Sequence, residues 1–243
     1  MTGGHLPKAM LIDMDDTILA AGERPAVLLQ IADELAADLA PHMPQEVADR
    51  LEAELELFWS DPARHRVARF GVNQARLQVI VDTFRGFGSS SLTDHLAEQF
   101  AGRFATVRDE ITTIFPGALE GLKGLRDRGV RMCLITNGGA DTQRAKIARF
   151  GLAPWFDHIQ IEGEVGFGKP EEQAYRHAMA ILGAEPHETW IVGDNLEWEV
   201  AAPQRLGLTG VWVDGYGRGL PADSTVQPDR IIQSLTELLP RDG

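Results

Sequence analysis

The chain has 243 residues, of which 44% are hydrophobic and 24% charged, and its formal net charge is −13. This composition is typical of a globular enzyme with a sizeable buried core, and it excludes a disordered or fibrous chain. The acidic balance argues against binding to nucleic acid or to an anionic membrane surface, because both need a basic patch.

The cysteine usage and the N-terminal residues predict the compartment. Cys133 is the only cysteine and lies in the apolar run VRMCLIT, so we expect a small buried side chain and no internal disulfide. The first ten residues lack the apolar stretch of a signal peptide, and no run approaches the roughly 20 apolar residues that a membrane span needs. We therefore expect a cytoplasmic protein without membrane segments.

The first predicted element is a buried strand at residues 8–13, KAMLID. It ends against three carboxylates, Asp13, Asp15 and Asp16, with no basic residue next to them. Negative charge of this density beside a core strand costs free energy, so it indicates a site that binds a cation.

The next region, residues 24–108, has apolar residues at helical spacing and is predicted to be all-helical. Helices are expected near residues 24–39, 47–58, 75–84 and 93–107. Breakers such as APHMP and RGFGSSS separate them.

After residue 115 the pattern changes to short apolar runs that alternate with helices. The predicted strands are 130–136, 156–161, 188–194 and 209–215. The predicted helices are 118–129, 141–150, 170–182, 197–206 and 228–239. This alternation predicts an α/β fold with a parallel sheet covered on both faces. We expect one domain from residues 1–20 and 112–243, interrupted by a helical domain at 21–111.

Polar residues of catalytic type follow three of the predicted strands, and a lysine follows in a loop. They are Asp13, Asp15 and Thr17 after the first strand, Thr136 and Asn137 after the second, Asp194 and Glu199 after the fourth, and Lys169 in GFGKP. Ligands of open parallel sheets bind at the carboxyl ends of the strands, so we expect these side chains to share one pocket.

The residue types in this group fit phosphoryl transfer. Converging carboxylates select a hard divalent ion such as Mg²⁺. Asp13, with a pKa near the ordinary value of about 4, would be ionised and able to act as a nucleophile. Asp15, with a raised pKa, could protonate the departing oxygen. Lys169 and Thr136 could stabilise the charge of the transferred group.

The motifs DMDDT, ITN, GKP and GDNLEWE resemble, in order and spacing, the four motifs of the haloacid dehalogenase-like hydrolase superfamily. The insert at 21–111 also lies where the subclass with a helical C1 cap carries its cap. The resemblance implies a Rossmann-like core with a cap, and a Mg²⁺-dependent phosphatase that acts on a small phosphorylated metabolite through an aspartyl-phosphate. The sequence is similar to capped phosphatases such as N-acylneuraminate-9-phosphatase, pyrimidine 5′-nucleotidase and phosphoglycolate phosphatase. The resemblance leaves open which ester is the substrate and what the oligomeric state is.

The resemblance also assigns roles to residues. Asp13 resembles the nucleophile, Asp15 the acid and base, and Lys169 the catalytic lysine. Substrate binding is implied for Thr136, Asn137 and Thr17, of which Thr17 also supports its loop. Metal binding is implied for the carboxylates of Asp13 and Asp194 and for Asp15 through its main-chain carbonyl. One residue departs from the family pattern, because Glu199 stands where aspartate is usual. It is expected to support Lys169 or a water rather than to bind the metal directly.

Several alternatives remain open at this point. A phosphomutase or a 2-haloacid dehalogenase of the same superfamily would use the same nucleophile, although the dehalogenases lack the acidic residue present here as Asp15. A phospho-accepting signalling module also places an aspartate, a hydroxyl and a lysine at strand ends, but it is much shorter. A nucleotide triphosphatase P-loop is disfavoured, because Pro170 stands where GEVGFGK would need Ser or Thr.

Overall fold

The computed structural model describes residues 6–240, which divide into two compact units. Residues 6–20 and 113–240 form the first unit, and Ala21–Thr112 form the second. Every strand among the described residues belongs to the first unit. The second unit is helical.

The strands of the first unit are β1 (Ala9–Ile12), β2 (Leu19–Ala20), β3 (Thr113–Ile114), β4 (Arg131–Thr136), β5 (His158–Ile161), β6 (Thr189–Gly193), β7 (Thr209–Val213) and β8 (Arg230–Ile232). Its α-helices are α7 (Ala118–Asp127), α8 (Ala140–Arg149), α9 (Glu162–Val165), α10 (Glu172–Leu182) and α11 (Ala202–Gln204). The short helices are η1 (Ala153–Trp155), η2 (Pro186–Glu188) and η4 (Leu235–Leu238), which are 3₁₀, and η3 (Leu196–Ala201), which is a π-helix.

Six strands form a parallel sheet in the order β5-β4-β1-β6-β7-β8, so the predicted α/β fold is confirmed. β1 lies inside the sheet, with Ile12 opposite Leu134 of β4 and Val192 of β6. Because all six strands run the same way, the polar residues that follow β1, β4 and β6 emerge at one edge.

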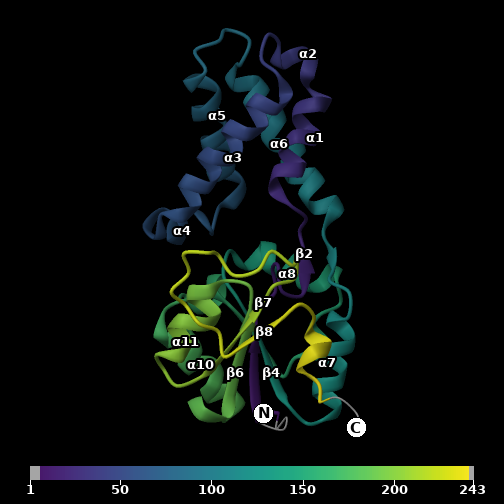
Figure 1. Cartoon of the computed structure of the whole chain (residues 1–243), viewed down its shortest axis with the longest axis vertical. Helices are drawn as coiled ribbons and strands as arrows, with labels where there is room; N and C mark the ends of the chain where they lie inside the picture. The colour runs from purple at the N-terminus through teal and green to yellow at the C-terminus, as the bar shows by residue number, and fades with distance from the viewer. Residues whose placement is uncertain (1–5, 241–243) are drawn as a thin grey trace. The chain divides into compact units, whose positions relative to one another are not determined.

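Side chains of β1 alternate between the two faces of the sheet, as the period of a strand requires. Met10 and Ile12 pack in the apolar cluster that contains residues of α7, whereas Ala9 and Leu11 pack in the cluster that contains residues of α10. Figure 1 shows α7 on one side of the sheet and α10 with α11 on the other. All four β1 side chains are fully buried, which fixes the point where Asp13 leaves the core.

One predicted helix near the C-terminus is wrong, and another is helical but only partly α-helical. Residues 228–239 contain strand β8 and the short helix η4 instead of one long helix. Ile232 is buried while Ile231 is exposed, which is the alternation of a strand at the edge of the sheet, and Ser234 and Glu237 form a capping box that starts η4 afresh. Residues 197–206 begin as the π-helix η3 and contain only three α-helical residues, Ala202–Gln204.

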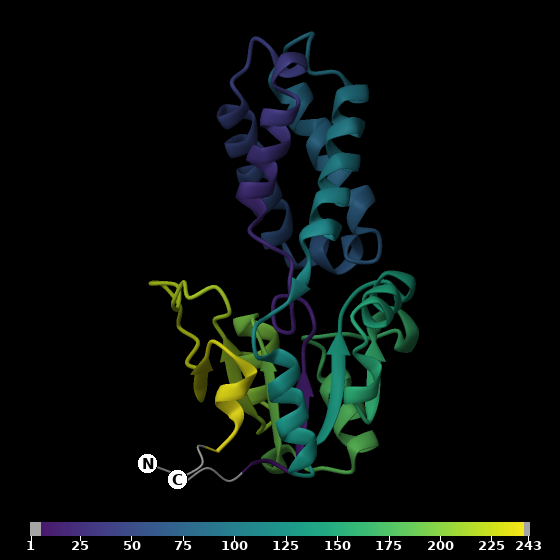
Figure 2. The ribbon, with the colours of Figure 1, turned by 90° about the vertical axis from the view of Figure 1, so that its right-hand side faces the viewer.

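The second unit consists of α1 (Arg24–Glu34), α2 (Ala36–Leu39), α3 (Pro44–Ser60), α4 (Pro62–Ala68), α5 (Val72–Gly86) and α6 (Asp94–Ile111). α1 packs against α3 and α6, and α5 packs against the same two helices, so these four form a bundle (Figure 2). Prolines at the first turns of α1, α3 and α4 favour helix starts at these points. Nowhere in residues 6–240 is a helix long and apolar enough to span a membrane.

The chain leaves and re-enters the first unit through a short antiparallel ribbon that the apolar pattern did not predict. β2 pairs with β3, with Leu19 opposite Ile114. Just before it, Asp16 adopts a left-handed conformation with φ 55°, which aspartate tolerates better than most residues. This turn lets the chain bend sharply between Asp13 and the ribbon.

Candidate active site

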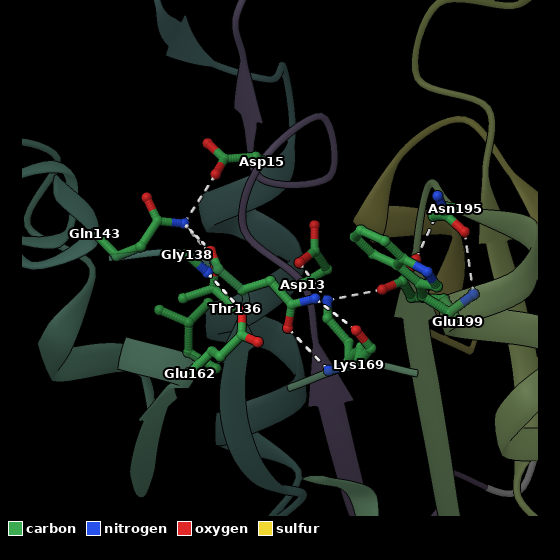
Figure 3. Close-up of polar contacts among 12 residues, drawn as sticks. Asp13, Asp15, Thr136, Gly138, Gln143, Glu162, Lys169, Asn195 and Glu199 are labelled. Carbon is green, nitrogen blue, oxygen red and sulfur yellow. Dashed lines mark hydrogen bonds and ion pairs between the residues drawn. The ribbon is translucent and has the colours of Figure 1, made fainter. Parts of the chain in front are cut away.

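The predicted site residues come from four segments of the first unit. Asp13 follows β1, Thr136 ends β4, Asp194 follows β6, and Lys169 lies in the loop ahead of α10. β1 lies between β4 and β6, so these strand ends are neighbours. Figure 3 shows Asp13, Thr136, Lys169 and Glu199 grouped at this edge.

Lys169 joins the first motif to the fourth. Its Nζ donates to Asp13 Oδ1 at 2.5 Å and to Glu199 Oε1 at 2.7 Å. The side chains of Lys169 and Glu199 are each 1% exposed, and that of Asp13 is 10% exposed. Burial alone would lower the pKa of Lys169, but the two carboxylates outweigh it and raise the pKa, so the ammonium stays charged.

Glu199 is fixed at both of its oxygens. Oε1 accepts from Lys169, and Oε2 accepts from the backbone N–H of Asn195 at 2.9 Å. The π-helix η3 brings Glu199 back over the end of β6, where a Cβ on Gly193 would lie 2.2 Å from Glu199 Cγ. Glycine at 193 is therefore required for this approach. Glu199 thus contacts Lys169, and its supporting role stays a prediction.

Asn137 holds the lysine-bearing loop through its side chain. Its Nδ2 donates to the Lys169 carbonyl at 2.7 Å, and its Oδ1 accepts from the Lys169 backbone N–H at 2.9 Å. A Cβ on Gly168 would lie 2.6 Å from Asn137 Oδ1, so this approach also depends on glycine. The Asn137 amide thus positions Lys169.

The pKa of Asp13 differs from the sequence-based expectation. Burial raises it to about 7, Lys169 opposes this only in part, and Glu199 and Asp15 add to the rise. The rise differs from the expected pKa near the ordinary carboxyl value, because sequence did not reveal how deeply the carboxyl is buried. A cation beside Asp13 would counteract this rise.

Asp15 departs from expectation in the opposite direction. Lys146 Nζ contacts both of its oxygens, at 2.8 and 2.9 Å, and Gln143 Nε2 donates to Oδ2 at 3.0 Å. Burial raises the pKa of Asp15, but Lys146 and Gln143 outweigh burial and lower it below its ordinary value. The predicted rise is therefore wrong in this arrangement, because an unforeseen cation pairs with the carboxylate.

The two predicted threonines differ in their surroundings. Thr136 Oγ1 accepts from Gln143 Nε2 at 2.6 Å, and the same nitrogen donates to the Asn137 carbonyl at 2.9 Å. Thr17 is 2% exposed, and its Oγ1 has no hydrogen-bond partner among residues 6–240. The structure therefore brings Thr136 into the polar cluster, whereas the Thr17 hydroxyl stays outside it.

Asp194 completes a concentration of negative charge. Burial raises its pKa well above the ordinary value, and Asp13, Glu199 and Asp16 raise it further. Its backbone carbonyl accepts from Trp212 Nε1 at 2.6 Å, which fixes the loop after β6. Asp13 and Asp194, two carboxylates that interact electrostatically, offer the hard oxygen ligands that Mg²⁺ prefers.

The fit to a metal depends on backbone as well as side chains. In the part of the chain that the structure describes, no three His, Cys, Asp or Glu side chains are grouped so as to hold a metal ion. Two carboxylates with several waters and a main-chain carbonyl are, however, a common set for Mg²⁺. The donor set of Asp13, Asp194 and the Asp15 carbonyl therefore fits magnesium.

Gln143 and Lys146 were missed by the sequence analysis. Both lie on α8, three residues apart, so they project from one face of the helix. Their signal was available, since α8 starts directly after the ITN motif and its first turns lie near the strand ends. A lysine on a helix is usually solvated, however, and its partner Asp15 is 131 residues away.

Comparisons with known proteins agree with the four motifs. Residues 7–207 match the family model described as haloacid dehalogenase-like hydrolase. A phosphoserine phosphatase of Thermus thermophilus is 35% identical over 74% of this chain and 65% of that protein. A phosphoglycolate phosphatase of Pseudomonas putida is 28% identical over 98% of this chain and 80% of that protein.

Solved structures extend the likeness to the fold of nearly the whole chain. The HAD hydrolase YfnB of Bacillus subtilis, solved with magnesium, has a TM-score of 0.72 at 21% identity, over 96% of this chain and 97% of that one. The match to the Thermus phosphatase spans just under two thirds of that protein's length. The family match, in contrast, covers most of this chain, and the motif-based prediction is confirmed: the chain belongs to the haloacid dehalogenase-like hydrolase family.

Proposed function

We propose that this protein is a Mg²⁺-dependent phosphatase that hydrolyses a small phosphate monoester through an aspartyl-phosphate on Asp13. The observation that carries the proposal is the buried contact of Lys169 with both Asp13 and Glu199 at the strand ends. It supplies a positive charge beside a carboxylate oxygen, which an attack on an anionic ester needs. The phosphatase relatives support the same reaction class.

Asp13 is the proposed nucleophile. One of its carboxylate oxygens attacks phosphorus while the bond from phosphorus to the ester oxygen breaks. Asp15 gives a proton to that ester oxygen and later takes one from the water that hydrolyses the aspartyl-phosphate. Lys169 and the Thr136 hydroxyl stabilise the charge of the group in transit, and Glu199 keeps Lys169 in position.

Magnesium, held by Asp13, Asp194 and the Asp15 carbonyl, would neutralise negative charge on the phosphoryl oxygens when bound. The structure supports this assignment because Asp13 is buried and its negative charge acts on Asp194. Both carboxyls have raised pKa values, chiefly through burial and further through neighbouring carboxylates, and the single ammonium of Lys169 does not offset this rise.

The proposed substrate is a phosphorylated metabolite, such as a sugar phosphate or a nucleoside monophosphate, in a cytoplasmic setting. The relatives named phosphoserine phosphatase, phosphoglycolate phosphatase and pyrimidine 5′-nucleotidase act on small esters of different leaving groups. We propose that the helical unit Ala21–Thr112 acts as the cap that selects the leaving group. The shared site residues then serve the phosphoryl group alone.

The test is phosphate release from a panel of metabolite esters, with MgCl₂ and with a chelator. The wild-type protein should release phosphate only with the metal present. Asp13→Asn should lower kcat by at least about 10³-fold, because loss of a nucleophile removes the covalent step. The Asp13→Asn protein must be purified free of host phosphatases.

Asp127→Asn serves as the matched control, since Asp127 is exposed on α7 and pairs with Lys123. It should retain wild-type activity. Full Mg²⁺-dependent activity in Asp13→Asn would refute the assignment of the nucleophile. Chelator-resistant release of halide, or formation of an isomeric sugar phosphate, would instead indicate the dehalogenase or phosphomutase alternative.

A further inference from the structure

Two ammonium groups lie at this site, and they hold their aspartates differently. Lys169 and Asp13 form a buried pair, with side chains 1% and 10% exposed. Lys146 and Asp15 form a pair in which the side chains are 32% and 37% exposed. A partly solvated ion pair is weaker and more readily broken than a fully buried one. The first pair is therefore suited to a fixed role and the second to release.

The contacts of Asp15 occupy both of its oxygens. Oδ1 contacts Lys146 Nζ, and Oδ2 contacts both Lys146 Nζ and Gln143 Nε2. In Figure 3 the carboxylate of Asp15 points toward Gln143, away from Asp13. An acid that protonates a leaving group must instead bring an oxygen within hydrogen-bond reach of the ester oxygen. The observed arrangement competes with that position.

We propose that Lys146 and Gln143 form a resting dock for the Asp15 carboxylate, which Asp15 leaves in order to reach the leaving-group oxygen. This inference rests on the proposed phosphatase function. Lys146 is then a positioning residue that acts through Asp15. When Asp15 has left the dock, its carboxylate takes up a proton from solvent water and gives that proton to the ester oxygen as the bond to phosphorus breaks. The carboxylate so formed later accepts a proton from the attacking water.

The size of the effect follows from the exposure of the pair. A partly solvated pair shifts the equilibrium between docked and released Asp15 by about two- to fivefold. Gln143 is not a suitable site for a test, because it also holds Thr136 and the Asn137 carbonyl. Lys146 contacts Asp15 from the rim of the cluster, so its replacement leaves those other contacts intact.

The experiment compares kcat/KM for an alkyl phosphate and for nitrophenyl phosphate in Lys146→Met. Departure of an alkoxide needs a proton from Asp15, whereas nitrophenolate leaves with little help. Loss of the Lys146 charge would also weaken the attraction of the phosphate dianion, but this lowers kcat/KM for both esters equally and cancels in their ratio. The ratio of alkyl to aryl kcat/KM should rise about two- to fivefold in Lys146→Met. Lys146→Arg, which keeps the charge, should restore the wild-type ratio.

Lys123→Met is the matched control, because it removes another lysine that pairs with an aspartate on a helix of the same unit. It should leave the ratio unchanged. A fall of the ratio in Lys146→Met would mean that Lys146 holds Asp15 in its catalytic position, and an unchanged ratio would mean that it does not restrain Asp15. Either result would overturn the proposal.

A second measurement is independent of catalysis. It is a double-mutant cycle of Lys146→Met and Asp15→Asn in substrate-free protein, read by denaturant unfolding. Lys146→Met should lower the free energy of unfolding less in the Asp15→Asn background than in the wild-type protein. Purely additive effects would refute the dock. If the wild-type protein hydrolyses no ester, the proposed function and the release step both fail, while coupling in the cycle would still show the pairing itself.

Discussion

The two units of the molecule bury different kinds of residue. In the first unit, charged and polar side chains are buried together at one edge of the sheet, among them Asp13, Lys169 and Glu199. In the helical unit, the buried polar residues among those described are Arg69 and Thr83, and the rest of its core is apolar. Buried charges stabilise a protein poorly, whereas buried apolar side chains stabilise it well.

The contrast separates chemistry from stability. Asp13 and Asp194 have raised pKa values, so the first unit tolerates unfavourable charge at the point where the proposed reaction occurs. The helical unit carries no comparable cluster within Ala21–Thr112, and its four longer helices, α1, α3, α5 and α6, each bury a stripe of mainly apolar residues. Substitutions in the two units should therefore fail in different ways.

The largest effect is expected for Lys169→Met, which leaves Asp13 and Glu199 buried without their shared cation. Activity should fall by at least about 10³-fold, because charge stabilisation of the transferred group is lost. Stability at pH 8 should fall by about 3–5 kcal/mol, the usual cost of breaking a buried pair. Phosphate release and denaturant unfolding measure the two losses.

The stability loss in Lys169→Met should depend on pH. A carboxyl whose pKa is higher in the folded state binds its proton more tightly when folded, so stability falls as pH rises from the unfolded value through the folded one. The folded pKa of Asp13 is already about 7, against an ordinary value of 3.8, and loss of the ammonium raises it further. The destabilisation should therefore be smaller at pH 5 than at pH 8. An equal loss at both values would contradict this electrostatic origin.

The sequence predicted this cluster because of the sheet topology. Asp13, Thr136 and Asp194 each follow a parallel strand, and parallel strands end at one edge, so sequence order was enough to bring them together. The pKa values could not be predicted, because they depend on burial. The pairing of Lys146 with Asp15 was also missed, since the pattern of α8 does not show which partner a helical lysine meets across the fold.

The C-terminal segment 228–239 shows a different limit of sequence reasoning. Its apolar residues fit a helical period over twelve positions, yet Arg230–Ile232 pair with β7 as an edge strand. Tertiary pairing outweighs local propensity here, as it commonly does for short apolar runs. The four longer helices of the second unit were predicted because their periodic pattern is long and bounded by prolines and glycines. The short helix α4 was missed, since it buries no residue and has no apolar stripe.

A core substitution in the helical unit should affect stability without a chemical defect. Phe84 is 1% exposed and packs edge-on against Phe100, with ring centroids 5.9 Å apart. Phe84→Ala should cost about 3–5 kcal/mol in the free energy of unfolding, because it leaves a cavity. Phe70→Ala removes a ring that is 50% exposed and should cost much less. Equal losses in the two variants, measured in denaturant, would contradict the claim that this unit is held by its apolar core.

The smallest effect is expected from a substitution that touches nothing. Gly102 lies within α6, and a Cβ added there would meet no atom within 4 Å. Gly102→Ala should stabilise the protein by about 0.5–1 kcal/mol, because alanine loses less backbone entropy in a helix. Gly88 also has open space around it but has a φ of +67°, so Gly88→Ala should be destabilising by about 1–2 kcal/mol. The two sites differ in backbone conformation and not in available space. If thermal unfolding showed the melting temperature shifted in the same direction in both variants, backbone conformation would not decide the outcome.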